Sequence, residues 1–363
     1  MSATSILGIG TARAHHVVDQ SSLGRRYEGL LTAVTGDRLA GRRARFLFSR
    51  ARLRSRQFAI PDVADVGEPV LYGGGELPST AERMEVFARV APVLAEDACR
   101  RALSSAGVDP REVSSLTVAT CTGVGAPDLD VELMQRLGLP PTAERSLLVW
   151  MSCTGSFPAI RVGRRAVGSK PGAVALVVCV EVCSLHVQAD AESGSLVAHS
   201  LFADGASAIV VGEASPKLAL ATLGEGATRL VPEGRDALRW TFTDHGFQAH
   251  LGRDLPVLVE KATPSFIKDL IGEQASDVRG WCVHPGGPAI LDAVERALGL
   301  DPRSLDVSRE VLGTLGNMSS ATIWYVLERV LDDLDPGDMG LLLGFGTGLT
   351  LEGLVFQRGG RTR

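Results

Sequence analysis

Three residues of this sequence, Cys153, His284 and Asn317, carry side chains that together could transfer an acyl group. Cys153 comes directly before a helix predicted over roughly 155 to 168. A thiol there lies at the positive end of the peptide dipoles, which favours the nucleophilic thiolate. His284 opens HPGGPAILDAVE, where Pro285 and two glycines force a turn that should present the imidazole rather than bury it. Asn317 stands in GNMSSAT beside a predicted helix start, so the three types suit covalent catalysis by an assisted thiol.

Each of these residues also has a purely structural explanation. Most single cysteines are small buried hydrophobic residues, a histidine can cap a turn, and asparagine is a favoured N-cap. Cys179, Cys183 and Cys282 lie in apolar runs, so we expect them to pack without doing chemistry. Glu181 also follows an apolar run, and its carboxylate must be paired or hydrogen-bonded there, fixing a loop near the site.

The spacing of the candidate residues indicates an internal duplication. From Cys121 to Cys153 is 32 positions, and from His284 to Asn317 is 33. A second interval of 28 positions separates Cys153 from Glu181 and Asn317 from Phe345. Two similar halves would bring Cys153 and Asn317 to matching places, so we expect both to converge with His284 where strands end.

The elements that would position these residues alternate between strand and helix. Apolar runs predict strands within 5–9, 114–123, 147–153, 173–182, 206–214, 278–287 and 339–348. Helical spacing predicts helices over 80–106, 155–168 and 288–298, and another after Asn317. This alternation is typical of an α/β layered fold, which we divide into a half 1–214 with the cysteine and a half 215–363 with the histidine and asparagine.

Composition narrows the class of protein. The chain has 363 residues, is 45% hydrophobic and carries a net charge of −5, which suits a globular protein without general attraction to nucleic acid or to an anionic membrane. We expect a cytoplasmic protein because the N-terminus lacks a basic segment followed by a long apolar stretch. The six cysteines show neither CxxC pairs nor zinc-site spacing, so we expect no metal. GFGTG (344–348) and GIGTA (8–12) lack the remaining residues of nucleotide-binding motifs.

Four motifs together resemble chalcone synthase and its bacterial type III polyketide synthase relatives: VHPGGPAILDAVE, GNMSSAT, GFGTGLTLE and LFADGASAIVVG. The similarity runs nearly from end to end. It implies a thiolase-like αβαβα fold, a homodimer, a buried cavity reached by a CoA tunnel, and no prosthetic group. It also implies a Cys153, His284 and Asn317 triad that loads an acyl-CoA starter and condenses it with malonyl-CoA by decarboxylation, before cyclisation to an aromatic or pyrone product.

The resemblance also implies roles for further residues. Phe202 matches a gatekeeper between tunnel and cavity. Cavity positions fall at Cys121, His186, Trp240 and the glycine loop Gly344, Phe345 and Gly346. Ala126 replaces a methionine that reaches into the partner's cavity, and Arg50, Arg52, Arg54 and Arg56 match a basic strip for CoA phosphates. Thr347 replaces a proline, and Ala249, or Phe247 if the register shifts, stands at a second gatekeeper. These departures favour a bacterial product such as an alkylpyrone, an alkylresorcinol or a naphthalene.

Three other interpretations fit parts of the sequence. A β-ketoacyl-ACP synthase III shares the fold and triad, although HPGGPAILD and GFGTG argue against it. A papain-like protease has Cys, His and Asn in the same order, but its local cysteine signature is absent. A thiolase-fold scaffold without turnover would not need an intact triad.

Overall fold

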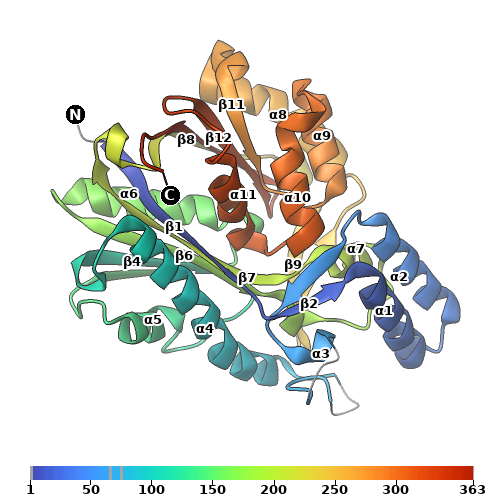
Figure 1. Cartoon of the computed structure of the whole chain (residues 1–363). Coiled ribbons are helices and arrows are strands. Elements are labelled where there is room, and N and C mark those ends of the chain that lie inside the picture. The colour runs from blue at the N-terminus through green and yellow to red at the C-terminus, as the bar shows by residue number, and fades with distance from the viewer. Residues whose placement is uncertain (1–2, 65–67, 74–76, 363) are drawn as a thin grey trace.

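The computed structural model describes residues 3–64, 68–73 and 77–362. Its centre is a nine-stranded sheet with the order β11-β12-β13-β8-β1-β7-β6-β4-β5, flanked by helices on both faces (Figure 1). The strands of this sheet are β1 (Ala3–Arg13), β4 (Val113–Thr120), β5 (Glu144–Val149), β6 (Val174–Val182), β7 (Asp204–Ala214), β8 (Ala221–Leu230), β11 (Val278–Val283), β12 (Met339–Gly346) and β13 (Thr350–Arg358). The α/β layering predicted from the sequence is therefore present.

The sheet continues across the predicted boundary between the two halves. Strands before residue 215 form one side of the sheet and strands after it form the other, and the sides meet where β1 pairs with β8. Position 214 is the last residue of β7, and position 215 opens the short connection to β8. The division into two halves stays a prediction, because a shared sheet does not separate them.

The helices cover this sheet because their apolar faces match its buried faces. The α-helices of the layers are α4 (Thr80–Ala106), α5 (Leu129–Leu137), α6 (Ser156–Ser169), α8 (Leu255–Ile271), α9 (Pro288–Leu298), α10 (Asp306–Leu315) and α11 (Thr322–Val330). A capping box between Ser79 and Glu82 starts α4, and left-handed Gly107 ends it. A side chain on Gly8 or Gly10 of β1 would overlap the backbone of α4, so these glycines allow the close packing.

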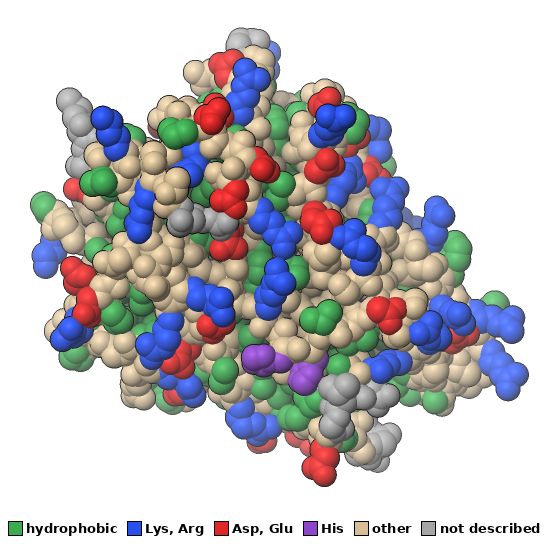
Figure 2. Space-filling model, in the orientation of Figure 1, with side chains coloured by type: hydrophobic (Ala, Val, Ile, Leu, Met, Phe, Trp, Pro, Cys, Tyr) green, Lys and Arg blue, Asp and Glu red, His purple; other side chains and the backbone are tan. Residues whose placement is uncertain are grey.

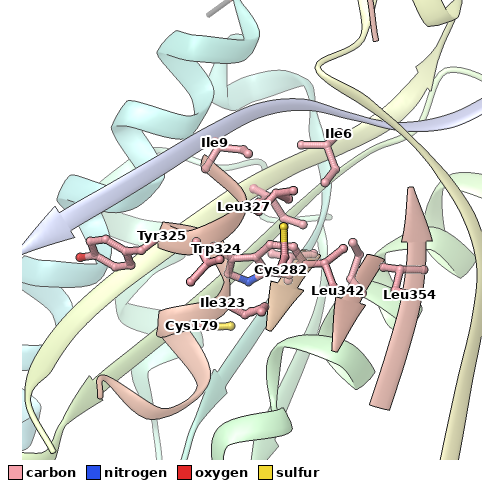
Figure 3. Close-up of a cluster of buried hydrophobic side chains, with 14 of the residues drawn as sticks. Ile6, Ile9, Cys179, Cys282, Ile323, Trp324, Tyr325, Leu327, Leu342 and Leu354 are labelled. Atoms are coloured by element: carbon pink, nitrogen blue, oxygen red, sulfur yellow. The ribbon is translucent and has the colours of Figure 1, made fainter. Parts of the chain in front are cut away.

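The central core lies where α11 packs between the two halves. Figure 3 shows Trp324 and Tyr325 of α11 among Ile6 and Ile9 of β1 and apolar residues of other strands. Cys179 and Cys282 belong to this cluster and are fully buried, as expected for packing residues. Within the described residues, none of the helices is both long and apolar enough to traverse a bilayer.

Two smaller units lie beside the main sheet. A helical hairpin of α1 (Gln20–Thr35) and α2 (Arg38–Arg50) is joined to a small sheet of β2 (His16–Asp19) and β3 (Ser55–Phe58), with α3 (Pro61–Ala64) next to it. A β-hairpin of β9 (Leu238–Thr243) and β10 (Gly246–Leu251) packs against α7 (Ser193–Leu201). Both units contribute residues to the cavities described below.

Candidate active site

Cys153 lies in a tight turn between β5 and α6. The turn is a 3-10 segment, Ser152–Thr154, and two non-glycine residues before the thiol, Trp150 and Ser152, have left-handed backbone with φ of 63° and 53°. The glycine loop packs directly against it, since a Cβ on Gly346 would meet the Thr154 hydroxyl at 2.2 Å. The sequence places the thiol one turn before α6 begins, so it faces the helix N-terminus.

His284 and Asn317 arrive from the second half of the chain. His284 directly follows β11, and its backbone N–H donates to the Leu343 carbonyl at 2.8 Å. Asn317 follows Gly316, which ends α10 with φ of 85°. The backbone N–H of Asn317 donates to the Leu201 carbonyl at 2.9 Å. Both backbones are thus fixed by neighbouring elements.

The three side chains meet in one cavity of about 140 Å³. The Asn317 amide Nδ2 lies 4.0 Å from the Cys153 sulfur and donates to the Gly286 carbonyl at 3.3 Å. Most other lining residues are apolar: Val197, Leu201, Phe202, Leu238, Leu251, Leu255, Pro256, Ile290 and Phe345. The convergence expected from the duplication is present in the structure.

Burial changes the charge states expected from the sequence. Burial raises the pKa of Cys153 to about 11. Hydrogen bonds from Ser319, Ser152 and Asn317 lower this pKa, but their effect is smaller than that of burial. The raised pKa differs from the expectation that the helix terminus favours the thiolate, because desolvation of the thiol outweighs the dipole. His284 is 1% exposed rather than presented to solvent, and burial lowers its pKa to about 3.

The imidazole of His284 is nevertheless available for chemistry. Neither of its ring nitrogens has a hydrogen-bond partner within the described residues, although both are buried. Asn317 combines its two candidate roles, since its Oδ1 accepts from the Ser319 N–H at 2.9 Å and so orders the turn before α11. Its Nδ2 stays directed at the cavity, so capping and catalysis are compatible.

Glu181 anchors a buried network next to the thiol. Its carboxylate accepts from the Cys121 N–H at 3.0 Å, from the Thr122 hydroxyl at 2.8 Å and from the Ser320 hydroxyl, and burial raises its pKa. The expectation of a hydrogen-bonded carboxylate is met, and Ser320 extends the bond to the other half of the chain. The Cys121 sulfur lies 3.2 Å from the Ser319 hydroxyl.

A second, larger cavity of about 260 Å³ lies on the other side of Phe202, which lines both cavities. Trp240 stacks on Phe202 with ring centroids 5.8 Å apart. His186 donates from Nε2 to the Thr122 carbonyl at 2.8 Å and accepts from the Phe247 N–H at 3.1 Å, so it forms a fixed wall. Phe247 and Ala249, the two candidates for the second gatekeeper position, both line this cavity.

Several positions from the resemblance lie elsewhere. Cys121 lines neither of these two cavities and packs against Glu181. Ala126 is exposed and lines neither of them, and Gly344 packs on the Phe157 ring. The cavity-wall role of Cys121 is therefore not supported, because its sulfur turns toward the buried carboxylate.

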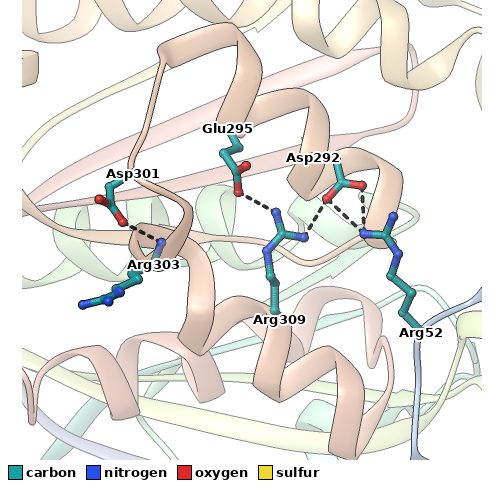
Figure 4. Close-up of polar contacts among 6 residues, drawn as sticks. All are labelled: Arg52, Asp292, Glu295, Asp301, Arg303 and Arg309. Atoms are coloured by element: carbon teal, nitrogen blue, oxygen red, sulfur yellow. Dashed lines mark hydrogen bonds and ion pairs between the residues drawn. The ribbon is translucent and has the colours of Figure 1, made fainter.

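The predicted basic strip is not one surface. Arg56 is buried and donates to the His199 and Phe202 carbonyls at 2.7 Å, so it positions Phe202 and is not part of an exposed strip. Arg52 pairs with Asp292 at 2.9 Å, beside the Arg309 pairs in Figure 4. Arg54 pairs with Glu310 at 2.6 Å, and Arg50 stands exposed at the end of α2.

Sequence reasoning missed Ser152 and Ser319, whose hydroxyls interact with the thiol. Both stand within two positions of a triad residue, and that proximity was the available signal. Within the part of the chain that the structure describes, no group of three or more His, Cys, Asp or Glu residues could hold a metal ion.

Comparison with known proteins covers nearly the whole chain. Residues 2–216 match the family model for the N-terminal domain of chalcone and stilbene synthases, and residues 222–358 match that for the C-terminal domain. A protein of Mycobacterium tuberculosis, the alpha-pyrone synthesis polyketide synthase-like Pks18, is 29% identical over 97% of this chain and 90% of its own length.

Solved structures show the same architecture. PKS-I of the brown alga Ectocarpus siliculosus matches with a TM-score of 0.91 and 27% identity over 99% of both chains. The C-terminal type III polyketide synthase domain of Steely1 from Dictyostelium matches with a TM-score of 0.89 and 25% identity, over 98% of this chain and 99% of that one. A type III pentaketide synthase of Neurospora crassa matches with a TM-score of 0.86 and 26% identity, over 98% of this chain and 99% of that one. These similarities confirm the predicted α/β, thiolase-like fold class.

Proposed function

Because this chain belongs to the chalcone and stilbene synthase family and is a type III polyketide synthase, we propose that Cys153 carries the acyl starter while malonyl units extend it. The family assignment confirms the resemblance drawn from the four motifs. The observation that carries the assignment of residues is one cavity that holds a thiol, an amide and an imidazole whose ring nitrogens have no hydrogen-bond partner among the described residues.

Loading begins with attack of the Cys153 sulfur on the thioester carbonyl of an acyl-CoA. The thiol proton passes to His284, which can accept it because burial lowers its pKa and keeps the imidazole neutral at pH 7. CoA leaves as its thiol after receiving this proton, and the acyl group stays on the sulfur. The two-step path replaces one difficult transfer with two easier ones.

Extension uses the same pocket. Malonyl-CoA loses CO₂, and the electron pair of the broken bond forms an enolate whose oxygen is stabilised by His284 and the Asn317 amide. The enolate carbon then attacks the acyl carbonyl and displaces the Cys153 sulfur, so the lengthened chain remains on CoA. An apolar lining excludes water, which would otherwise protonate the enolate.

For the starter, we propose an acyl chain with a long apolar tail, which supports an alkylpyrone or alkylresorcinol product over a naphthalene from malonyl units alone. The second cavity supports this proposal, since its lining is dominated by apolar side chains and Phe202 is its shared wall with the catalytic cavity. The printed name of the mycobacterial relative, alpha-pyrone synthesis, supports cyclisation to a pyrone.

Two further proposals concern the whole protein. A homodimer is supported by exposed Met151 and Phe242, which lie next to Trp150 close to the nucleophile. A cytoplasmic location is supported by the six cysteines, all of which are free thiols.

The test of the proposed function is mass spectrometry of the purified protein with malonyl-CoA and a series of acyl-CoA starters. Wild type should form products with two or more extensions, and Cys153→Ala should lose at least about 1,000-fold of turnover and all acyl-enzyme mass. Cys99→Ala, a buried thiol of α4, is the matched control and should still load. Undiminished turnover of Cys153→Ala would contradict the proposed nucleophile. A single extension that requires an acyl carrier protein would instead favour a β-ketoacyl-ACP synthase III.

A further inference from the structure

The α1–α2 hairpin carries a charge opposite to that of the rest of the protein. Residues 20–50 contain seven arginines and two acidic residues, which gives +5 within a chain whose total is −5. The hairpin stands at the right edge of the molecule in Figure 1, and Lys and Arg side chains gather at that edge in Figure 2. The net negative charge of the chain opposes binding to anionic surfaces in general, but this local positive patch can attract one.

Large apolar side chains lie exposed among these arginines. Leu39 and Phe46 of α2 are 74% and 61% exposed, and Leu30 and Val34 of α1 are exposed as well. The opposite side of the hairpin is a closed core, in which Leu23, Tyr27, Leu31, Ala44 and Phe48 are buried. The exposed residues are thus not part of an incomplete core.

The order of residues around α2 separates an apolar centre from basic flanks. At about 100° per residue, the order of side chains around one face of α2 is Arg38, Ser49, Arg42, Phe46, Leu39, Arg50 and Arg43. Arg38, Arg42 and Arg50 have no ion pair within the described residues, so their charge is not neutralised by the protein. We call this exposed surface of α2 the hairpin face.

The larger cavity lies on the α1 side of the hairpin. Leu23, Arg26, Tyr27 and Leu30 of α1 line that cavity, and Arg26 and Leu30 are exposed. Leu39 and Phe46 lie on the face of α2 that is turned away from α1, because Gly41 is the residue of α2 that packs against Thr32 and Glu28.

We propose that the hairpin face docks on the surface of an anionic lipid bilayer. Apolar side chains flanked by arginines are the pattern of a helix that lies in the plane of a membrane interface, with the aliphatic groups in the acyl region and the guanidinium groups on lipid phosphates. An acidic protein would match the charge, but it would not account for the large apolar side chains of Leu39 and Phe46 that lie exposed between the arginines. Docking in this way needs no spanning helix.

Flotation of the full-length protein with lipid vesicles tests this proposal without any need for turnover. Vesicles containing phosphatidylglycerol should carry the protein, those of phosphatidylcholine alone should carry it at least about tenfold less, and salt should weaken binding. Arg38→Glu/Arg42→Glu and Leu39→Ser/Phe46→Ser should each lower binding to the anionic vesicles by about tenfold or more.

Matched variants outside the hairpin provide the controls. Arg165→Glu/Lys170→Glu makes the same change of charge at exposed cations, and Leu218→Ser/Leu230→Ser makes the same loss of exposed apolar surface. Both should bind like wild type. Equal binding by hairpin and control variants would overturn the proposal, as would a lack of binding to anionic vesicles. A changed oligomeric state in the hairpin variants alone would instead assign the face to contact with a second copy, which also overturns it.

Discussion

The Cys153 sulfur lies between two opposing influences. The helix terminus and the hydrogen bonds from Ser152, Ser319 and Asn317 favour the thiolate, whereas complete burial and the nearby Glu181 carboxylate oppose it. The balance raises the pKa of the thiol to about 11, and burial lowers the pKa of His284 to about 3. At neutral pH the free enzyme therefore holds a thiol and a neutral imidazole, and the proton moves only when substrate is attacked.

This charge state predicts how Cys153 reacts with iodoacetamide in the free enzyme. A raised pKa means that the thiolate is scarce at pH 7 and increases as pH rises, so the alkylation rate should grow about tenfold per pH unit between pH 7 and 9. The measurement is the rate of mass gain on the Cys153 peptide, with the Cys99 peptide as a buried reference. A rate that is already maximal at pH 6 would show that a thiolate–imidazolium pair exists before substrate arrives.

At this scale the sequence predicted residue types better than environments. The spacing predicted that Cys153 and Asn317 converge, because repeated units bring equivalent positions together, and the resemblance implied the triad with His284. Exposure did not follow: His284 was expected in an open turn, yet walls from several distant segments bury it. Burial, and with it the sign of each pKa shift, depends on contacts that no local pattern contains.

Gly316 shows how the end of one helix positions a catalytic residue. It ends α10 with φ of 85°, and a Cβ there would meet Ala203 Cβ at 2.7 Å and Arg56 Cγ at 2.9 Å. Asn317 follows directly, and Arg56 holds the Phe202 carbonyl. One glycine thus governs both a triad residue and the wall between the two cavities.

Gly316→Ala should therefore reduce stability and activity together. The left-handed backbone and the overlap should together lower the free energy of unfolding by roughly 2 to 4 kcal/mol, measured by denaturant titration. Turnover should fall further than the folded fraction does, because Asn317 is displaced. Gly299→Ala is the matched control, since Gly299 ends α9 with φ of 59° and open space around it. The free energy of unfolding of Gly299→Ala should fall by about 1 kcal/mol, and its activity should be unchanged. An equal loss of turnover in Gly299→Ala and Gly316→Ala would refute the positioning role of Gly316.

Elements with strong periodicity were predicted well, and pairing partners were not. Helix 80–106 agrees with α4 at both ends, because the capping serine and the terminal glycine are local signals. Arg56 was placed on a basic strip with Arg50, Arg52 and Arg54, but β3 starts at Ser55, so Arg56 lies in a strand and turns inward. The pairing of β9 with β10, which brings Trp240 opposite Ala249, depends on tertiary contacts and was left open.

For the whole molecule, a surface next to the nucleophile carries large apolar side chains that a single chain leaves exposed. Trp150 and Ser152 hold left-handed backbone before and after Met151, a conformation that costs about 1 to 3 kcal/mol per residue and persists only under constraint. Met151 is 40% exposed, and Phe242, whose ring packs edge-on against Trp150, is 58% exposed. A second copy of the chain against this surface would bury both side chains and brace the turn that presents Cys153.

Sedimentation of the purified protein should therefore give about twice the chain mass of 38.3 kDa. Phe242→Asp places a charge in the proposed contact, and it should weaken the dimer by about tenfold or more, since a buried unpaired charge opposes association. Leu218→Asp makes a similar change at an exposed residue outside this surface and should leave the dimer intact. Acyl loading of Cys153 should fall with the dimer fraction, because the strained turn loses its support. A monomeric wild type, or a Phe242→Asp variant that stays fully dimeric, would place the subunit contact elsewhere or remove it.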